Sequence, residues 1–239
     1  MEKIGKQIIV FFFFTLCSIA FYGQTYSNQK TYYKWFDDVV GVGNTAIYNG
    51  IQYKRNYNTI KNNHEYFLSS DYMSGTVVYS NQPYFNVTLK YDIYNDELIA
   101  QLPSFNSYNT ILLIQQKVKS FSINDHNFVK LSTENGTGFY EVLFEGLEVK
   151  IYKKYEKTLK KHLDKDFVYD VFKGKETYLL YNNNKYYRIK SKGSILKVLP
   201  KHKKSINSFY KNNKDLKKNN YDLFLSELSN YLSDKISSN

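Results

Sequence analysis

The sequence predicts a mainly β (α+β) fold, in which an antiparallel β meander forms a barrel- or sandwich-like domain and a short helical region follows. Tyr and Phe account for 25 and 17 of the 239 residues. Together with Ile, Val and Thr they favour strands, because aromatic and β-branched side chains pack well on a pleated surface. Only 3 prolines interrupt the chain. Several segments also alternate apolar and polar residues, which indicates strands with one buried face.

The first 24 residues have the pattern of a cleavable secretory signal peptide. Lys3 and Lys6 precede an apolar run over residues 8–21, which is shorter than the roughly 20 residues of a membrane-spanning helix. An uncleaved N-terminal anchor is the alternative interpretation. We therefore expect an exported protein that is periplasmic, outer-membrane-associated or secreted.

Cys17 is the only cysteine, and it lies inside the apolar run. A lipid-acceptor cysteine would end such a run, so we do not expect lipidation here. Cleavage near Gly23 or Gln24 would remove Cys17 from the mature chain. Such a chain has no disulfide, no cysteine nucleophile and no thiolate metal site.

The β domain is assigned to residues 25–190. The alternation is clearest in residues 76–79 and 84–91. Further strands are predicted at residues 98–102, 111–114, 118–123, 127–131, 138–144 and 147–153. Segments rich in Asn, Asp, Ser and Gly separate them, as in residues 104–109. Short strands joined by tight turns are typical of an antiparallel meander.

A short pattern occurs three times, at residues 47–53, 78–84 and 180–186. In each case an aliphatic residue and a Tyr precede a turn rich in Asn, Gly or Ser, and a second Tyr follows. Asn and Gly accept the positive φ angles of tight hairpin turns. We interpret each occurrence as a β-hairpin.

The basic helical C-terminal region is assigned to residues 191–239. Helices are predicted at residues 194–199, 205–212 and 221–236, and Ser194 is the expected N-cap of the first. The last helix is amphipathic. Its apolar face comprises Leu225, Leu228, Tyr231, Leu232 and Ile236. The Asn-rich stretch over residues 212–220 is predicted to be a loop.

Positive charge is concentrated in the second half of the chain. The net charge is +11, yet residues 25–149 carry nine Lys and Arg against twelve Asp and Glu. Residues 150–239 carry twenty-two basic residues against nine acidic ones. This asymmetry indicates an anionic partner for one face. The alternative is that the lysines only keep the protein soluble.

Nucleic acid is not the expected partner. Arg55 and Arg188 are the only arginines, whereas arginine commonly supplies the forked contacts to bases and phosphates. Export also argues against nucleic acid. An acidic envelope protein, an acidic polysaccharide or an anionic membrane surface is favoured, and the oligomeric state is left open. The many tyrosines could bind sugar rings or a partner chain, although compositional bias is a competing explanation.

The sequence points to no catalytic residue, metal site or cofactor, and it leaves the binding residues unknown. Its four histidines are His64, His126, His162 and His202. They lack the paired spacing that converging metal ligands show. Residues 92–97 hold several oxygen ligands but lack the central glycine of a calcium loop, so we interpret them as a hairpin turn.

Carboxylates that could act as acids or bases include Asp71, Asp92 and Glu141, but nothing pairs two of them. No nucleophile elbow or phosphate loop occurs. Residues 41–44 contain Gly41 and Gly43 without a following basic residue.

An ordered set of segments resembles a family of uncharacterised exported proteins of Bacteroidota. The similar segments are residues 67–71, 75–79, 84, 87–92, 96–98, 121–131, 137–140 and 186–194, and the resemblance extends over residues 43–215. It implies an address in the cell envelope and supplies no catalytic residues.

Three hypotheses on function follow. The first is a non-enzymatic, envelope-associated binding protein whose basic helical region contacts an acidic partner. The second is a hydrolase acting on envelope glycans or lipids. The third is a carrier that holds an apolar ligand inside a β-barrel.

Overall fold

The computed structural model describes residues 31–33, 41, 43, 45–105, 107–164 and 167–237, with side chains as far as Ser233. The predicted signal peptide, Cys17 and part of the segment 41–44 lie outside the described residues. The chain divides into two units, Met1–Thr45 and Ala46–Asn239. Within the ranges described, no helix combines the length and the apolarity needed to cross a bilayer. The second unit contains the sheet and the C-terminal helices.

The second unit is mainly β, and its strands form one antiparallel sheet of eleven strands. The strands are β1 (Ile51–Gln52), β2 (Met73–Tyr79), β3 (Gln82–Asp92), β4 (Glu97–Ser104), β5 (Ser107–Leu112), β6 (Val118–Ile123), β7 (His126–Thr133), β8 (Gly136–Glu145), β9 (Lys150–Asp164), β10 (Phe167–Asn182) and β11 (Lys185–Ile189). Their order is β1-β5-β4-β3-β2-β6-β7-β8-β9-β10-β11. The predicted meander is therefore confirmed, and β1 and β11 form the two edges of an unclosed sheet.

The strands from β2 to β8 roll around a common apolar core. The ring of Tyr91 on β3 contacts Phe121 on β6, Phe128 on β7 and Phe139 on β8, with ring centroids 5.1, 5.2 and 6.1 Å apart. Strands β3 and β8 are not neighbours in the sheet, so these contacts show that the sheet folds back on itself. The interior is filled by aromatic side chains in edge-to-face contact, an arrangement that ring quadrupoles favour.

Two of the three predicted hairpins are confirmed. Ser80 and Asn81 join β2 to β3, and Asn183 and Asn184 join β10 to β11, all four with positive φ. The prediction for residues 47–53 was wrong. There a short 3-10 helix (Ala46–Tyr48) is followed by β1, which pairs with β5 rather than with its own neighbour.

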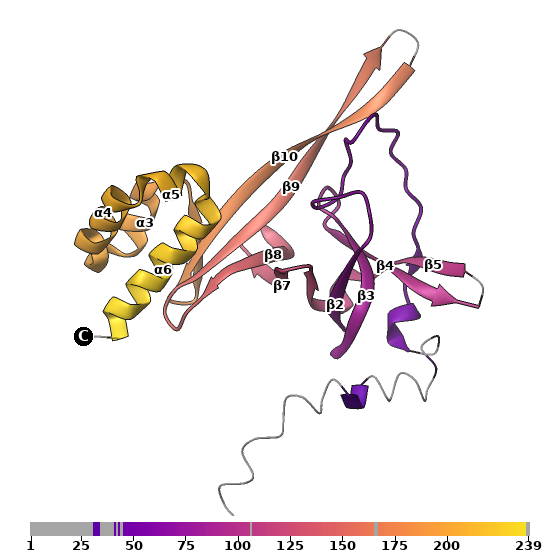
Figure 1. Cartoon of the computed structure of the whole chain (residues 1–239), viewed down its shortest axis with the longest axis horizontal. Helices are drawn as coiled ribbons and strands as arrows, with labels where there is room; N and C mark the ends of the chain where they lie inside the picture. The colour runs from indigo at the N-terminus through magenta and orange to yellow at the C-terminus, as the bar shows by residue number, and fades with distance from the viewer. Residues whose placement is uncertain are drawn as a thin grey trace, which may run out of the picture. The chain divides into compact units, whose positions relative to one another are not determined.

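The hairpin of β9 and β10 is much longer than the sequence predicted (Figure 1). The predicted strand over residues 147–153 begins too early and ends eleven residues short of Asp164. The segment before β2 supports one side of the hairpin. The backbone N–H of Asn58 donates to the Asp170 carboxylate at 3.0 Å, and the Asn63 side chain bonds both backbone groups of Phe172. Near the tip, backbone pairing holds the two strands together without burial, because most side chains there are exposed.

The C-terminal region is helical, as predicted. Its elements are α3 (Lys192–Val198), a 3-10 turn (Pro200–His202), α4 (Lys203–Asn212), α5 (Lys214–Asn219) and α6 (Tyr221–Ser237). Ser191, not Ser194, caps α3, and Ser194 completes a capping box from the third helical position. The predicted loop over residues 212–220 was wrong, because α5 occupies most of it. Asn213 and Asn220 mark its two ends, and Leu216 packs against the helical core.

The helices cover one face of the sheet at its β8–β11 end (Figure 1). Ile151 of β9 and Leu180 of β10 pack against Ile195, Ile206, Phe224, Leu225, Leu228 and Leu232. The amphipathic prediction for α6 is confirmed for Leu225, Leu228 and Leu232, which are buried. Tyr231 is partly buried against the same core, and the side chain of Ile236 lies outside the described part.

Candidate anion-binding surface

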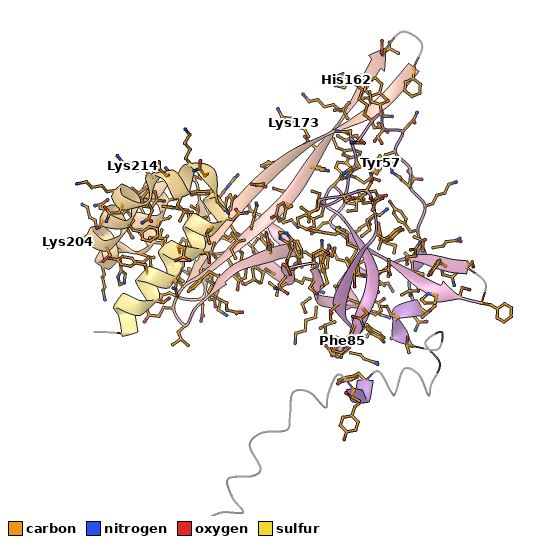
Figure 2. The ribbon with its side chains drawn as sticks, in the orientation of Figure 1. Tyr57, Phe85, His162, Lys173, Lys204 and Lys214 are labelled. Atoms are coloured by element: carbon orange, nitrogen blue, oxygen red, sulfur yellow. The ribbon has the colours of Figure 1, made fainter. Side chains whose placement is uncertain are left out.

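The segment from Ser191 to Asn220 carries nine lysines and a single acidic residue, Asp215. It folds into α3, α4 and α5, which place their apolar side chains in the core that they share with α6 and the sheet and leave their lysines outside. Figure 2 shows Lys204 and Lys214 on the outer side of these helices. Eight of the nine are exposed, and Lys192 is half-buried.

Five of these lysines surround one hollow of about 630 Å³. It is lined by Lys192, Asn207, Tyr210, Lys211, Lys214, Lys217 and Lys218. On α4, Asn207, Tyr210 and Lys211 follow i, i+3, i+4 spacing, which places three side chains on one helix face. On α5, Lys214, Lys217 and Lys218 repeat that spacing. Two short helices therefore direct matching faces into the same space, which we call the lysine hollow.

Tyr210 forms the floor of the lysine hollow. The residue is only 8% exposed, and burial raises the pKa of its hydroxyl, which keeps the phenol neutral. The ammonium groups of Lys192 and Lys217 lie 5.3 and 5.4 Å from the ring centroid. Cation–π attraction to the ring holds both lysines near the hollow.

Within the part of the chain that the structure describes, no carboxylate lines the lysine hollow. Among the described residues, none of the nine lysines from Lys192 to Lys218 forms an ion pair, whereas several lysines of the sheet do. The paired lysines are Lys150 with Glu145, Lys153 with Glu176 and Asp222, Lys154 with Asp96, and Lys175 with Glu156. No described carboxylate therefore neutralises the positive potential of the hollow through an ion pair.

The four histidines lie in different parts of the structure. His64 stacks on Tyr66, His126 contacts the Glu141 carboxylate at 2.5 Å, and His162 stacks on Tyr169 near the end of the long hairpin. His202 lies in the turn before α4. Within the described ranges, no three His, Cys, Asp or Glu side chains gather as a metal-binding group would require.

The interpretation of residues 92–97 as a hairpin turn is confirmed. The Asp92 carboxylate accepts hydrogen bonds from the backbone N–H groups of Tyr94 and Asn95, at 2.8 and 3.0 Å, and so shapes the turn from β3 to β4. Burial raises the pKa of Asp92. Asp71 lies in an exposed turn, and Glu141 is buried on β8, where it also accepts a hydrogen bond from Tyr155. The three carboxylates thus belong to different elements and different networks.

The sequence predicted the basic region but not the residues that converge in it. Tyr210 and Asn207 carry no charge, and the Asn-rich composition of residues 212–220 favours a loop, whereas the structure has helix α5 there. The spacing of Lys214, Lys217 and Lys218 was the available signal, because it places three ammonium groups on one face only if the segment is helical.

No family model matches this chain, and no curated protein or solved structure matches it. The resemblance to exported proteins of Bacteroidota therefore stays a prediction.

Proposed function

We propose that this chain is an exported, envelope-associated binding protein that holds an anionic partner in the lysine hollow and carries out no reaction on it. The supporting observation is the set of five lysines, unpaired within the described part of the chain, around one concave surface. Export rests on the sequence pattern of residues 1–24.

Holding several ammonium groups close together is unfavourable, and no carboxylate among the described residues pairs with the lysines of the hollow. On the sheet, cross-strand partners such as Lys175 and Glu156 reduce that cost. On α4 and α5, Lys211, Lys214 and Lys218 repel one another. An anionic partner would relieve this repulsion on binding.

The chemistry of lysine indicates which anions fit. Each ammonium group is a compact charge on a flexible stem and imposes little geometry on its partner. The hollow is concave, so it suits charged groups that project from a polymer better than it suits a flat bilayer. An acidic polysaccharide is the partner favoured here, ahead of an acidic protein or an anionic membrane surface.

Binding of the purified chain to polygalacturonate, followed by titration calorimetry at several salt concentrations, tests the proposal. Replacing Lys192, Lys211, Lys214, Lys217 and Lys218 with Gln should weaken binding at least about tenfold, since exposed charge contacts contribute about 0.3–1 kcal/mol each. Wild-type affinity should also fall as salt rises, because screening weakens exposed charge pairs.

The matched control removes the same charge elsewhere, by replacing Lys54, Lys61, Lys119, Lys160 and Lys173 with Gln, all of them exposed. If both quintuple variants lose affinity equally, net charge alone drives binding and the lysine hollow is not the site.

Cross-linking in intact envelopes tests the expected location. A photo-reactive residue at Asn207 should capture a partner that is absent when the same residue is placed at Lys54. Recovery of the chain only from the cytoplasmic fraction would contradict export.

A further inference from the structure

A second hollow lies on the face of the sheet that the C-terminal helices do not cover. Side chains alternate between faces along a strand. On β9, Ile151 and Lys153 therefore point toward the helices, whereas Tyr152 and Lys154 point to the other face. The hollow measures about 420 Å³, within the range of small-molecule sites.

Polar groups from four strands and two turns line this hollow. They are Tyr94, Asp96, Asn135, Thr137, Tyr140, Lys154, Glu156, Lys157, Lys175, Thr177 and Arg188. Hydroxyl and amide groups from four of the lining residues could exchange hydrogen bonds with a hydroxylated ligand; these are Asn135, Thr137, Tyr140 and Thr177. Leu179 and the ring of Tyr140 give the floor an apolar portion.

Two of the four cations in the lining are held by the protein itself. Lys154 forms an ion pair of 2.6 Å with Asp96 and lies 5.2 Å from the Tyr140 ring centroid. Lys157 donates to the backbone carbonyl oxygens of His64 and Tyr66, the latter at 2.9 Å. These two cations complete the wall and are not available to a ligand.

Lys175 and Arg188 are the cations left for a ligand. Lys175 has only a long contact of 3.6 Å with Glu156. Arg188 is exposed, and within the described part of the chain its guanidinium forms no hydrogen bond and no ion pair. The register Leu179↔Arg188 places it on the same face as Thr177, two residues along β10.

An unpaired guanidinium beside hydroxyl groups is suited to one class of ligand. Its planar fork binds a carboxylate through two parallel hydrogen bonds. The neighbouring hydroxyl and amide groups match sugar hydroxyls. Tyr181 and Tyr186 extend the same face with half-exposed rings, which offer amphipathic contact area beside the hollow.

We propose that this second hollow binds a carboxylated sugar, with Arg188 holding the carboxylate and Thr177 and Asn135 contacting ring hydroxyls. The site is separate from the lysine hollow, on the opposite face of the sheet, and does not depend on the function proposed for that surface.

Titration calorimetry of the purified full chain with D-glucuronate tests this assignment, with D-glucose and acetate as comparison ligands. Glucuronate should bind more tightly than either, because only it offers both the carboxylate and the hydroxyl groups. Arg188→Gln should weaken glucuronate binding at least about tenfold, as expected for the loss of a charge-assisted pair. The glucuronate affinity of Arg188→Lys should lie between those of the wild type and Arg188→Gln, since lysine keeps the charge but lacks the planar fork of the guanidinium.

Lys185→Gln is the matched control, because Lys185 lies on the same edge strand and its register with Asn182 places it on the other face. It should bind glucuronate as the wild type does, and thermal unfolding should show both variants folded. The quintuple lysine variant of the helical region should also keep this binding, which separates the two proposals. Equal binding of glucose and glucuronate, or unchanged affinity in Arg188→Gln, would overturn the assignment.

Discussion

The ammonium group of Lys153 on β9 lies 2.8 Å from a carboxylate oxygen of Asp222 on α6, and this ion pair links the sheet to the C-terminal helices. Lys153 is only 4% exposed and also contacts Glu176 at 3.0 Å. The hydroxyl of Tyr178 donates to the other oxygen of Asp222 at 2.7 Å. A buried charge at this junction depends on its carboxylate partners, because an uncompensated charge is costly away from water.

Asp222→Asn should therefore destabilise the protein. The substitution keeps the shape of the side chain but removes the charge opposite Lys153, and we expect a loss of about 2 kcal/mol in the free energy of unfolding. Urea unfolding followed by circular dichroism measures this change. Asp215→Asn, at an exposed carboxylate on α5, should leave stability within about 0.5 kcal/mol of the wild type. Equal stability of the two variants would show that the ion pair contributes nothing.

Lys90→Met should stabilise the protein at neutral pH. Lys90 is 8% exposed, and its ammonium group lies 4.5 and 4.0 Å from the ring centroids of Tyr66 and Tyr72. Burial lowers the pKa of Lys90, which means that its charged form is less stable in the folded protein than in the unfolded chain. The cation–π attraction of the two tyrosine rings does not offset this effect. A Met side chain of similar length removes that cost, and we expect a gain of about 1 kcal/mol.

The stabilisation by Lys90→Met should decrease as the pH rises. Below the folded pKa of Lys90 both states carry the charge, and the wild type bears the full cost. As the pH rises toward the ordinary value of 10.5, the folded state loses its proton first and the wild type recovers stability. The advantage of Lys90→Met, measured by thermal unfolding, should therefore shrink between neutral pH and about pH 10. A destabilised variant at pH 7 would mean that cation–π attraction outweighs desolvation.

The turns and the buried strands could be predicted from sequence because local chemistry fixes them. Asn81 and Asn183 accept positive φ, and the alternation around Val87 and Leu89 reports a buried face. The outer half of the β9–β10 hairpin gave no such signal. Its residues, such as Lys160 and Lys161, are exposed, and its order comes from the backbone pairing of β9 with β10 and from the contacts that Asn58 and Asn63 make with β10.

The candidate sites, too, could be predicted only in part from the sequence. The count of lysines after residue 190 predicted a basic region. Their convergence around Tyr210 required knowing that α4 and α5 meet at Asn213. The hollow beside Arg188 could not be predicted, because it combines β8, β9, β10 and β11 with the turn at Asp96. Single-strand patterns contain no information on such long-range neighbours.

Glu65→Gln should reduce the sensitivity of the protein to acid. Glu65 is fully buried, and Arg55 donates to both of its carboxylate oxygens, at 2.8 and 3.0 Å. Burial alone would raise the pKa of Glu65, but the hydrogen bonds and charge of Arg55 outweigh it and lower the pKa below 4.5. This contribution to stability is complete above the unfolded pKa and is lost as the pH falls through the folded one.

We therefore expect the wild type to lose more stability than Glu65→Gln between about pH 5 and pH 3. At pH 7 the variant should be less stable by about 2 kcal/mol, because a charge-assisted pair is lost. Chemical unfolding across this pH range measures both effects, with Glu134→Gln in an exposed turn as the control. Parallel pH profiles for wild type and Glu65→Gln would contradict the role given to the Arg55–Glu65 pair.

Gly138→Ala should separate Lys154 from Asp96. A Cβ atom at Gly138 would lie 2.5 Å from a carboxylate oxygen of Asp96 and 2.6 Å from the ammonium group of Lys154. Asp96 cannot easily move, because it also accepts hydrogen bonds from the Tyr91 hydroxyl at 2.5 Å and the backbone N–H of Phe139 at 3.2 Å. The flexible end of Lys154 would shift instead, and the half-buried ion pair would break.

The expected cost of Gly138→Ala is about 1–3 kcal/mol in the free energy of unfolding, as for other insertions into a packed site. Gly174→Ala is the matched control, since a Cβ atom on that β10 glycine meets nothing within 4 Å. It should be neutral or slightly stabilising, because Ala restricts the unfolded chain more than Gly does. If Gly138→Ala and Gly174→Ala unfold at the same urea concentration, the Asp96–Lys154 contact is dispensable for stability. The wall of the second hollow would then have to be held by Lys157 and the strands alone.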